Sequence, residues 1–81
     1  MIIKYFAWVR DITNKDLDKI NKDHPKSINE LKLKLSNLYP ELEKHINSDV
    51  LRYAINMEYT STEKELNSTD EIAVFPPVSG G

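Results

Sequence analysis

The last seven residues, Phe75-Pro76-Pro77-Val78-Ser79-Gly80-Gly81, form the stretch whose residue types and spacing could do chemistry. The reacting group would be the carboxylate of Gly81. A carboxylate of this kind has a pKa of about 3.5, so at neutral pH it is ionised and a poor electrophile. It therefore has to be activated by another protein before it can carry an atom to an acceptor.

The backbone of this stretch suits such a role. Pro76 and Pro77 fix φ and lack an N–H, so we expect the chain to leave the domain extended and unpaired. Gly80 and Gly81 have no Cβ and can pass where no other residue fits. A stiff exit with a slim end would suit a carboxylate threaded into a partner's active site, whereas a frayed and functionless end is the alternative. The residues alone favour neither interpretation, and both divide the chain into a domain of residues 1–75 and a tail of residues 76–81.

Composition limits the remaining possibilities. With 81 residues, 40% hydrophobic and 30% charged, the chain is expected to form one globular domain. A net charge of −2 and the lack of a long apolar run argue against nucleic-acid and membrane partners. The chain has no cysteine, and Met1-Ile2-Ile3-Lys4 does not have the layout of a signal peptide, so a cytoplasmic location is expected.

The N-terminal part reads as two strands. Alternation predicts a strand over residues 2–9, followed by turn chemistry at 13–15 and a short strand within 16–22 that pairs with the first. Two sets of side chains then face opposite ways: Ile3, Tyr5, Ala7 and Val9 toward the core, and Phe6 and Trp8 away from it.

The clearest helix covers residues 27–38. Ser27 and Glu30 have the spacing of a capping box. Four residues at helical spacing predict one buried stripe: Ile28, Leu31, Leu35 and Leu38. A further short turn of helix is expected within residues 40–46.

The C-terminal half predicts a hairpin and a final strand. Residues 51–55 and 58–60 flank a turn at Asn56-Met57, and Leu66 is the expected core anchor of the following loop. In the final strand, alternation sends Ile72 and Val74 to the core and Ala73 and Phe75 to the opposite face. The result is a two-layer α+β domain, with one main helix on one face of a mixed four- to five-stranded sheet. Its uncovered face would hold Phe6, Trp8 and Phe75, as a partner-binding surface does.

This architecture resembles the β-grasp, or ubiquitin-like, fold, and more closely the MoaD family, the small subunit of molybdopterin synthase. Four stretches carry the resemblance: residues 3–11, the helix starting at Ser27, Tyr53-Ala54-Ile55-Asn56, and residues 70–81. Thr69 departs from the family, which usually has glycine there.

The resemblance implies a sulfur carrier. An E1-like adenylyltransferase similar to MoeB would adenylate Gly81 with ATP, and sulfur from a donor protein would then replace AMP to give a thiocarboxylate. The tail would enter the active site of a MoaE-like large subunit, in a heterotetramer, and pass sulfur to cyclic pyranopterin monophosphate. The catalytic groups would belong to these partners, and this chain would bind neither a cofactor nor a metal.

The resemblance also assigns residues. Gly80 and Gly81 form the reacting end, and four residues position it: Pro76, Pro77, Val78 and Ser79. Four others would contact partners: Phe75, Phe6, Tyr59 and Arg10.

Two alternatives remain at this point. One is a related carrier for thiazole synthesis or for conjugation to proteins, although the thiazole type is usually shorter and lacks the Phe-Pro-Pro-Val-Ser lead. The other is an interaction module with an inert tail. His24 and His45 lack the spacing of metal ligands, and Glu63 and Glu65 lie in a polar loop that would not perturb an acid–base pair.

Overall fold

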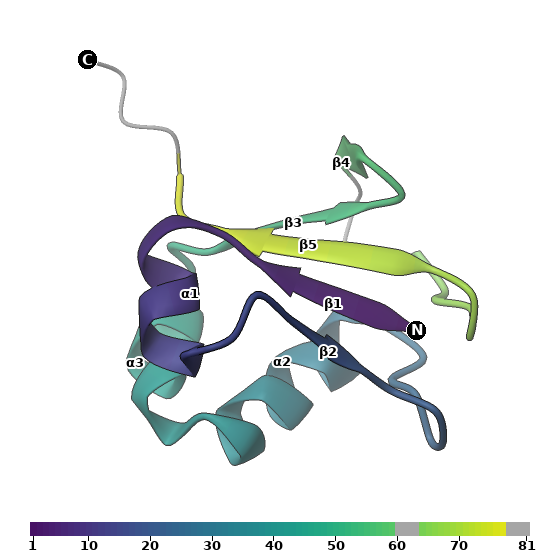
Figure 1. Ribbon diagram of the computed structural model, residues 1–81, viewed down its shortest axis with the longest axis horizontal. Coiled ribbons are helices and arrows are strands. Elements are labelled where there is room, and N and C mark those ends of the chain that lie inside the picture. Colours follow the sequence, from purple (N-terminus) through teal and green to yellow (C-terminus); the bar gives the residue numbers. More distant parts are fainter. Residues whose placement is uncertain (60–63, 78–81) are drawn as a thin grey trace.

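The computed structural model describes residues 1–59 and 64–77, with the main chain alone at Tyr59. The elements follow in this order: β1 (Ile2–Tyr5), α1 (Ala7–Thr13), β2 (Leu17–Lys19), α2 (Ile28–Leu38), the 3-10 turn η1 (Pro40–Leu42), α3 (Glu43–Asn47), β3 (Arg52–Ile55), β4 (Glu58–Tyr59) and β5 (Glu71–Phe75). The strands form a five-stranded sheet in the order β2-β1-β5-β3-β4. The central β1–β5 pair is parallel and the other pairs are antiparallel. Figure 1 shows the helices on one side of this sheet, and the predicted two-layer α+β fold is confirmed.

The core lies between the sheet and the helical layer, in which α2, α1, η1 and α3 all contribute buried side chains. On the strands, every second residue points inward: Ile3, Tyr5, Ile72 and Val74 are at most 2% exposed. They are in register with one another, because Ile3 pairs with Ile72 and Tyr5 pairs with Val74. Leu66 is also buried in this core, as expected for the anchor of its loop.

Helix α2 begins as its capping residues predict. The Ser27 hydroxyl accepts a hydrogen bond from the Glu30 N–H at 3.1 Å, which satisfies a donor that the first turn leaves unpaired. The predicted stripe is buried at Ile28, Leu31 and Leu35. The prediction is wrong for the last residue of the stripe, because Leu38 is 49% exposed. The final turn of α2 thus carries an apolar side chain that the core does not cover.

The predicted strand over residues 2–9 is wrong beyond Tyr5. Phe6 is still extended, but Ala7 has a φ of 53° and turns the chain into α1. Val9 keeps its predicted burial, now as a helical residue together with Thr13 four positions later. A run of this length fits alternation and helical spacing equally well, so the pattern could not distinguish them. Trp8 therefore lies on α1 and not on the face of the sheet, and Ala7 is exposed.

The turns follow their sequence signals. Asn14 ends α1 in the left-handed conformation. Asn56 and Met57 have φ values of 51° and 71°, as a two-residue hairpin turn with a right-handed strand twist requires. The second strand is shorter than predicted, at Leu17–Lys19. The expected helical turn after Pro40 is present as η1 and α3, so that α2 is one of several helices in its layer.

Candidate functional site: an open sheet face beside the tail

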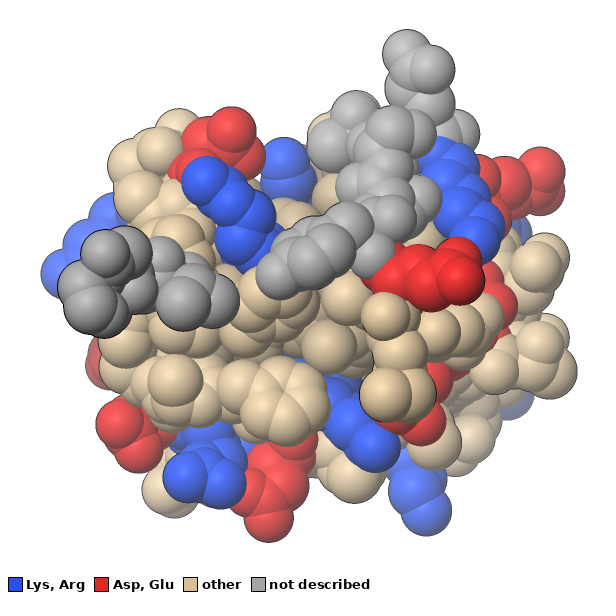
Figure 2. Space-filling view, turned by 90° about the horizontal axis from the view of Figure 1, so that it is seen from above, with Lys and Arg blue, Asp and Glu red and all other residues tan. Residues whose placement is uncertain are grey.

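On the face of the sheet opposite the helices, the central side chains are those of small, uncharged residues. Strand register puts Lys4, Ala73, Ala54 and Tyr59 in one row across it. In Figure 2, seen from above, uncharged residues form a broad area between groups of charged ones. Next to Ala73, Lys4 of the central strand β1 forms an ion pair with Glu71 at 3.0 Å. Two alanines bordered by charged side chains can receive apolar side chains from another protein.

Two phenylalanines stand beside the exit of the tail. Phe75 ends β5 on the open face, in register with Arg52 and one residue after the buried Val74. The N–H of Phe6 donates to the Val74 carbonyl at 3.1 Å and so extends the β1–β5 register by one residue. Phe6 is 47% exposed and is placed next to Phe75 by this register. The strand register thus places the two residues predicted to dock a partner side by side, but Trp8 does not join them.

The tail leaves the sheet directly after Phe75. Pro76 is half-buried and Pro77 is exposed. Neither has an N–H to donate, so the β5 ladder cannot continue through them. The other predicted tail residues, Val78, Ser79, Gly80 and Gly81, lie outside the described residues.

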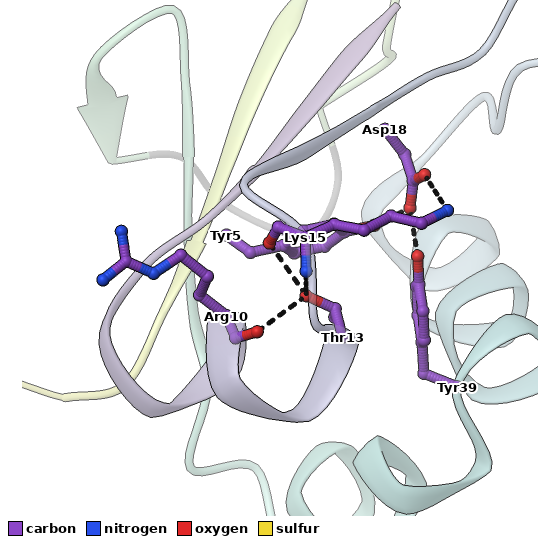
Figure 3. Close-up of polar contacts among 6 residues, drawn as sticks. All are labelled: Tyr5, Arg10, Thr13, Lys15, Asp18 and Tyr39. Carbon is purple, nitrogen blue, oxygen red and sulfur yellow. Dashed lines mark hydrogen bonds and ion pairs between the residues drawn. The ribbon is translucent and has the colours of Figure 1, made fainter.

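The two remaining residues predicted to contact partners, Tyr59 and Arg10, lie away from the centre of the open sheet face. Tyr59 is the last described residue of the edge strand β4 and pairs through its main chain with Ala54. Arg10 was predicted at the end of a strand; the structure places it on α1, where its guanidinium forms an exposed ion pair with Asp16 at 3.5 Å. Figure 3 shows this side chain directed away from the neighbouring polar cluster. Arg10 and the open face are thus on different elements.

That polar cluster was not predicted. The Asp18 carboxylate accepts hydrogen bonds from the hydroxyls of Tyr5 and Tyr39, the former at 2.7 Å, and from the Lys15 ammonium at 3.1 Å (Figure 3). It joins β1, β2 and the end of α2. A signal was available, because a tyrosine assigned to the core needs a partner for its hydroxyl.

The cluster shifts the pKa values of its members. Burial by itself would raise the pKa of Asp18, but the hydrogen bonds from Tyr39, Tyr5 and Lys15 outweigh it and hold this pKa below its usual value. Burial and the adjacent carboxylate raise the pKa of Tyr5, so its hydroxyl keeps its proton and remains a donor. A second carboxylate, Asp70, is buried and accepts from the Asn67 N–H at 2.8 Å and the Asn56 amide at 3.0 Å, and these bonds lower its pKa.

These carboxylates predict a loss of stability in acid. An aspartate with a lowered folded-state pKa contributes stability that is fully present above about pH 4, and this is lost as pH falls through the folded pKa. At pH 7, Asp18→Asn is expected to cost about 1–3 kcal/mol, because its amide group cannot accept from all three donors. Urea unfolding at pH 7 and pH 3 measures both effects. The exposed Asp11→Asn is the matched control, and an equal loss in it would contradict the role of the cluster.

Other candidate chemistry is not supported by the described residues. Within residues 1–59 and 64–77, no group of three His, Asp or Glu side chains could hold a metal ion. His45 instead packs against Trp8 in a tilted arrangement, with ring centroids 4.6 Å apart. No helix in the described part of the chain is long and apolar enough to cross a membrane.

The family profile described as the ThiS family matches residues 3–81. The chain belongs to the ThiS family. Two relatives named "Molybdopterin synthase sulfur carrier subunit" resemble it over nearly their full length. The Dictyostelium discoideum protein is 39% identical and the alignment covers 98% of this chain and 93% of that one. The Escherichia coli protein is 28% identical, and the alignment covers 98% of this chain and 96% of that one.

Solved structures support the fold of this ThiS-family chain. A putative molybdopterin converting factor subunit 1 from Pyrococcus furiosus has a TM-score of 0.82 at 24% identity, covering 95% of both chains. The small archaeal modifier protein 1 of Methanosarcina acetivorans has a TM-score of 0.80 at 28% identity, covering 99% of this chain and 94% of that one. The predicted resemblance to MoaD-type carriers with a β-grasp fold is confirmed.

Proposed function

We propose that this chain is the sulfur carrier subunit of a molybdopterin synthase. The observation that carries the proposal is the 39% identity, over almost the whole chain, to a protein of that name. The local geometry is compatible with it, since the Phe6 and Phe75 pair lies beside the exit of the tail. The name of the relative also implies a large subunit as the principal partner.

The reaction proposed for the tail proceeds in two transfers. An E1-like enzyme joins the Gly81 carboxylate to AMP from ATP and releases pyrophosphate. Sulfur at the hydrosulfide level, supplied by a donor protein, then attacks the acyl carbon and displaces AMP, leaving a thiocarboxylate. In the active site of the large subunit, that sulfur passes to cyclic pyranopterin monophosphate, and two such transfers build the dithiolene.

In this proposal the residues of the chain bind the large subunit and position the tail. Phe75 and Phe6 dock on the large subunit, and Pro76 and Pro77 limit the entropy lost when the tail is ordered. Gly80 and Gly81 fit two different active sites because they have no side chain. Activation of the carboxylate and stabilisation of the leaving groups belong to the partners.

Intact-mass measurement tests the proposal. After incubation with the activating enzyme, ATP and a sulfur donor, the chain is expected to gain roughly 16 Da, the difference between oxygen and sulfur, at its terminal acyl group. The loaded chain and the large subunit should then convert cyclic pyranopterin monophosphate to molybdopterin. Loading without this conversion, but with transfer to a thiazole precursor or attachment to lysines, would favour the related carriers instead.

A further inference from the structure

A second surface lies on the helical side of the domain. An open hollow of about 500 Å³ runs between α1 and the η1–α3 segment, and a smaller one of about 120 Å³ continues it toward the end of α2. The two share Ile12, Pro40 and Glu41 in their walls. We refer to this continuous depression, from Leu38 to His45, as the α1 groove.

The floor of the α1 groove is apolar. Leu38 is 49% exposed and is the one member of the α2 stripe that the core leaves uncovered. Ile12 lies opposite it on α1 and is half-buried. At the far end, His45 packs against the ring of Trp8, which is 37% exposed. Leu38 on α2, Ile12 on α1 and Pro40 on η1 thus contribute apolar surface to one depression.

The rim of the groove carries an excess of carboxylates. Glu41 and Glu43 line it with a single cationic side chain, Lys44. Both glutamates are exposed, and neither forms an ion pair with any residue in the described ranges 1–59 and 64–77. A ligand with lysine or arginine beside an apolar side chain would match both the floor and the rim.

One wall of the groove is held in place. Tyr39 lines the smaller hollow, and its hydroxyl donates to Asp18 while its ring packs edge-on to Tyr5 at a centroid distance of 5.8 Å. These contacts fix the junction of α2 and η1 to the sheet. A preformed wall lowers the ordering cost of binding.

We propose that the α1 groove docks a short basic amphipathic segment of a partner protein. The groove is formed by the helical layer, whereas the open sheet face lies on the other layer (Figure 1). A protein bound in the groove therefore leaves the open face and the exit of the tail accessible. The domain can hold two partners at once, one on each layer.

Trp8 is the only tryptophan of the chain, and its ring packs against His45, which lines the groove, so its fluorescence reports on binding there through this contact. The probe is an amphipathic octapeptide of leucine and lysine, and its counterpart with glutamate in place of lysine is the charge control. The lysine peptide is expected to change the Trp8 emission saturably, and the glutamate peptide to bind at least about tenfold more weakly.

Substitutions inside and outside the groove test whether the lysine peptide binds there. Leu38→Ser and the double change Glu41→Lys with Glu43→Lys are each expected to weaken the lysine peptide about tenfold. Leu33→Ser, which removes a more exposed leucine (67%) from another side of α2, should leave binding within about twofold. Thermal unfolding of each variant verifies that the domain remains folded.

Several results would overturn the proposal. Equal binding of the two peptides would show that charge plays no part, and an equal effect of Leu33→Ser would show non-specific adhesion. The lack of a saturable Trp8 response would place any binding elsewhere. Self-association of the chain that Leu38→Ser abolishes would identify a second copy, and not a basic segment, as the occupant. None of these outcomes affects the mass gain expected of a sulfur carrier.

Discussion

A chain without Gly81 is expected to fold normally and to fail in sulfur transfer. The variant would present the carboxylate of Gly80 instead, about 3.5 Å short of the position that the partner active sites engage. A misplacement of 1 Å can cost about 100-fold in rate, so molybdopterin formation should fall by at least that factor. The mass gain after incubation with the activating enzyme and the rate of molybdopterin formation are the two measurements.

Two comparisons make this result specific to the terminus. Adding one residue after Gly81 should be as damaging as the deletion, because it also displaces the carboxylate. Lys34→Ala, a substitution on the helical layer, should load and transfer sulfur normally. The unfolding temperature should be unchanged in all three variants, since the changes lie outside the core. Molybdopterin formation at the normal rate without Gly81 would disprove the carrier role of that residue.

Neighbouring substitutions on β5 are expected to separate stability from partner binding. Val74 is fully buried, so Val74→Ala should destabilise the domain by about 2 kcal/mol and lower its unfolding temperature by about 10 °C. Phe75→Ala changes the next residue, on the open face. It should cost the fold less than about 1 kcal/mol but weaken binding to the large subunit roughly 10- to 100-fold. Thermal unfolding and titration with the large subunit measure the two quantities on the same samples.

The contrast between the two variants is the test. Below its unfolding temperature, Val74→Ala should bind the large subunit almost as the natural chain does. Phe6→Ala should resemble Phe75→Ala, because the hydrogen bond from the Phe6 N–H to the Val74 carbonyl places Phe6 beside Phe75 in the strand register. If Phe75→Ala instead lowers the unfolding temperature as much as Val74→Ala, then Phe75 stabilises the domain and the large subunit binds elsewhere.

Much of the fold could be predicted because its signals are local. The cap at Ser27, the turn at Asn56-Met57 and the alternation over Ile72–Phe75 each depend on a few adjacent residues, and the structure confirms them. The start of α1 could not be predicted in this way. It depends on the positive φ of Ala7, a conformation that alanine rarely adopts and that leaves no mark in the sequence.

The site was predicted unevenly for related reasons. The positions of Phe75 and Phe6 could be predicted from strand register, and both residues lie where expected. Trp8 was wrongly predicted on that face, because the strand over residues 2–9 ends at Tyr5 and Trp8 lies on α1. The Asp18 cluster brings together side chains up to 34 positions apart in sequence, from Tyr5 to Tyr39, and no local pattern links them. The roles of Gly80 and Gly81 depend on partners, so they remain predictions from family resemblance.

The position of β5 between β1 and β3 has a consequence for biosynthesis. Of the described strands β5 is the last to be translated, yet it is the one that joins the β2–β1 pair to the β3–β4 pair. Until it leaves the ribosome, the earlier strands are two separate antiparallel pairs, and such pairs are unstable in isolation. An interrupted translation product therefore has neither a closed core nor an assembled face for partners. Because of this strand order, the domain can fold only after synthesis has reached β5, the strand that leads into the tail.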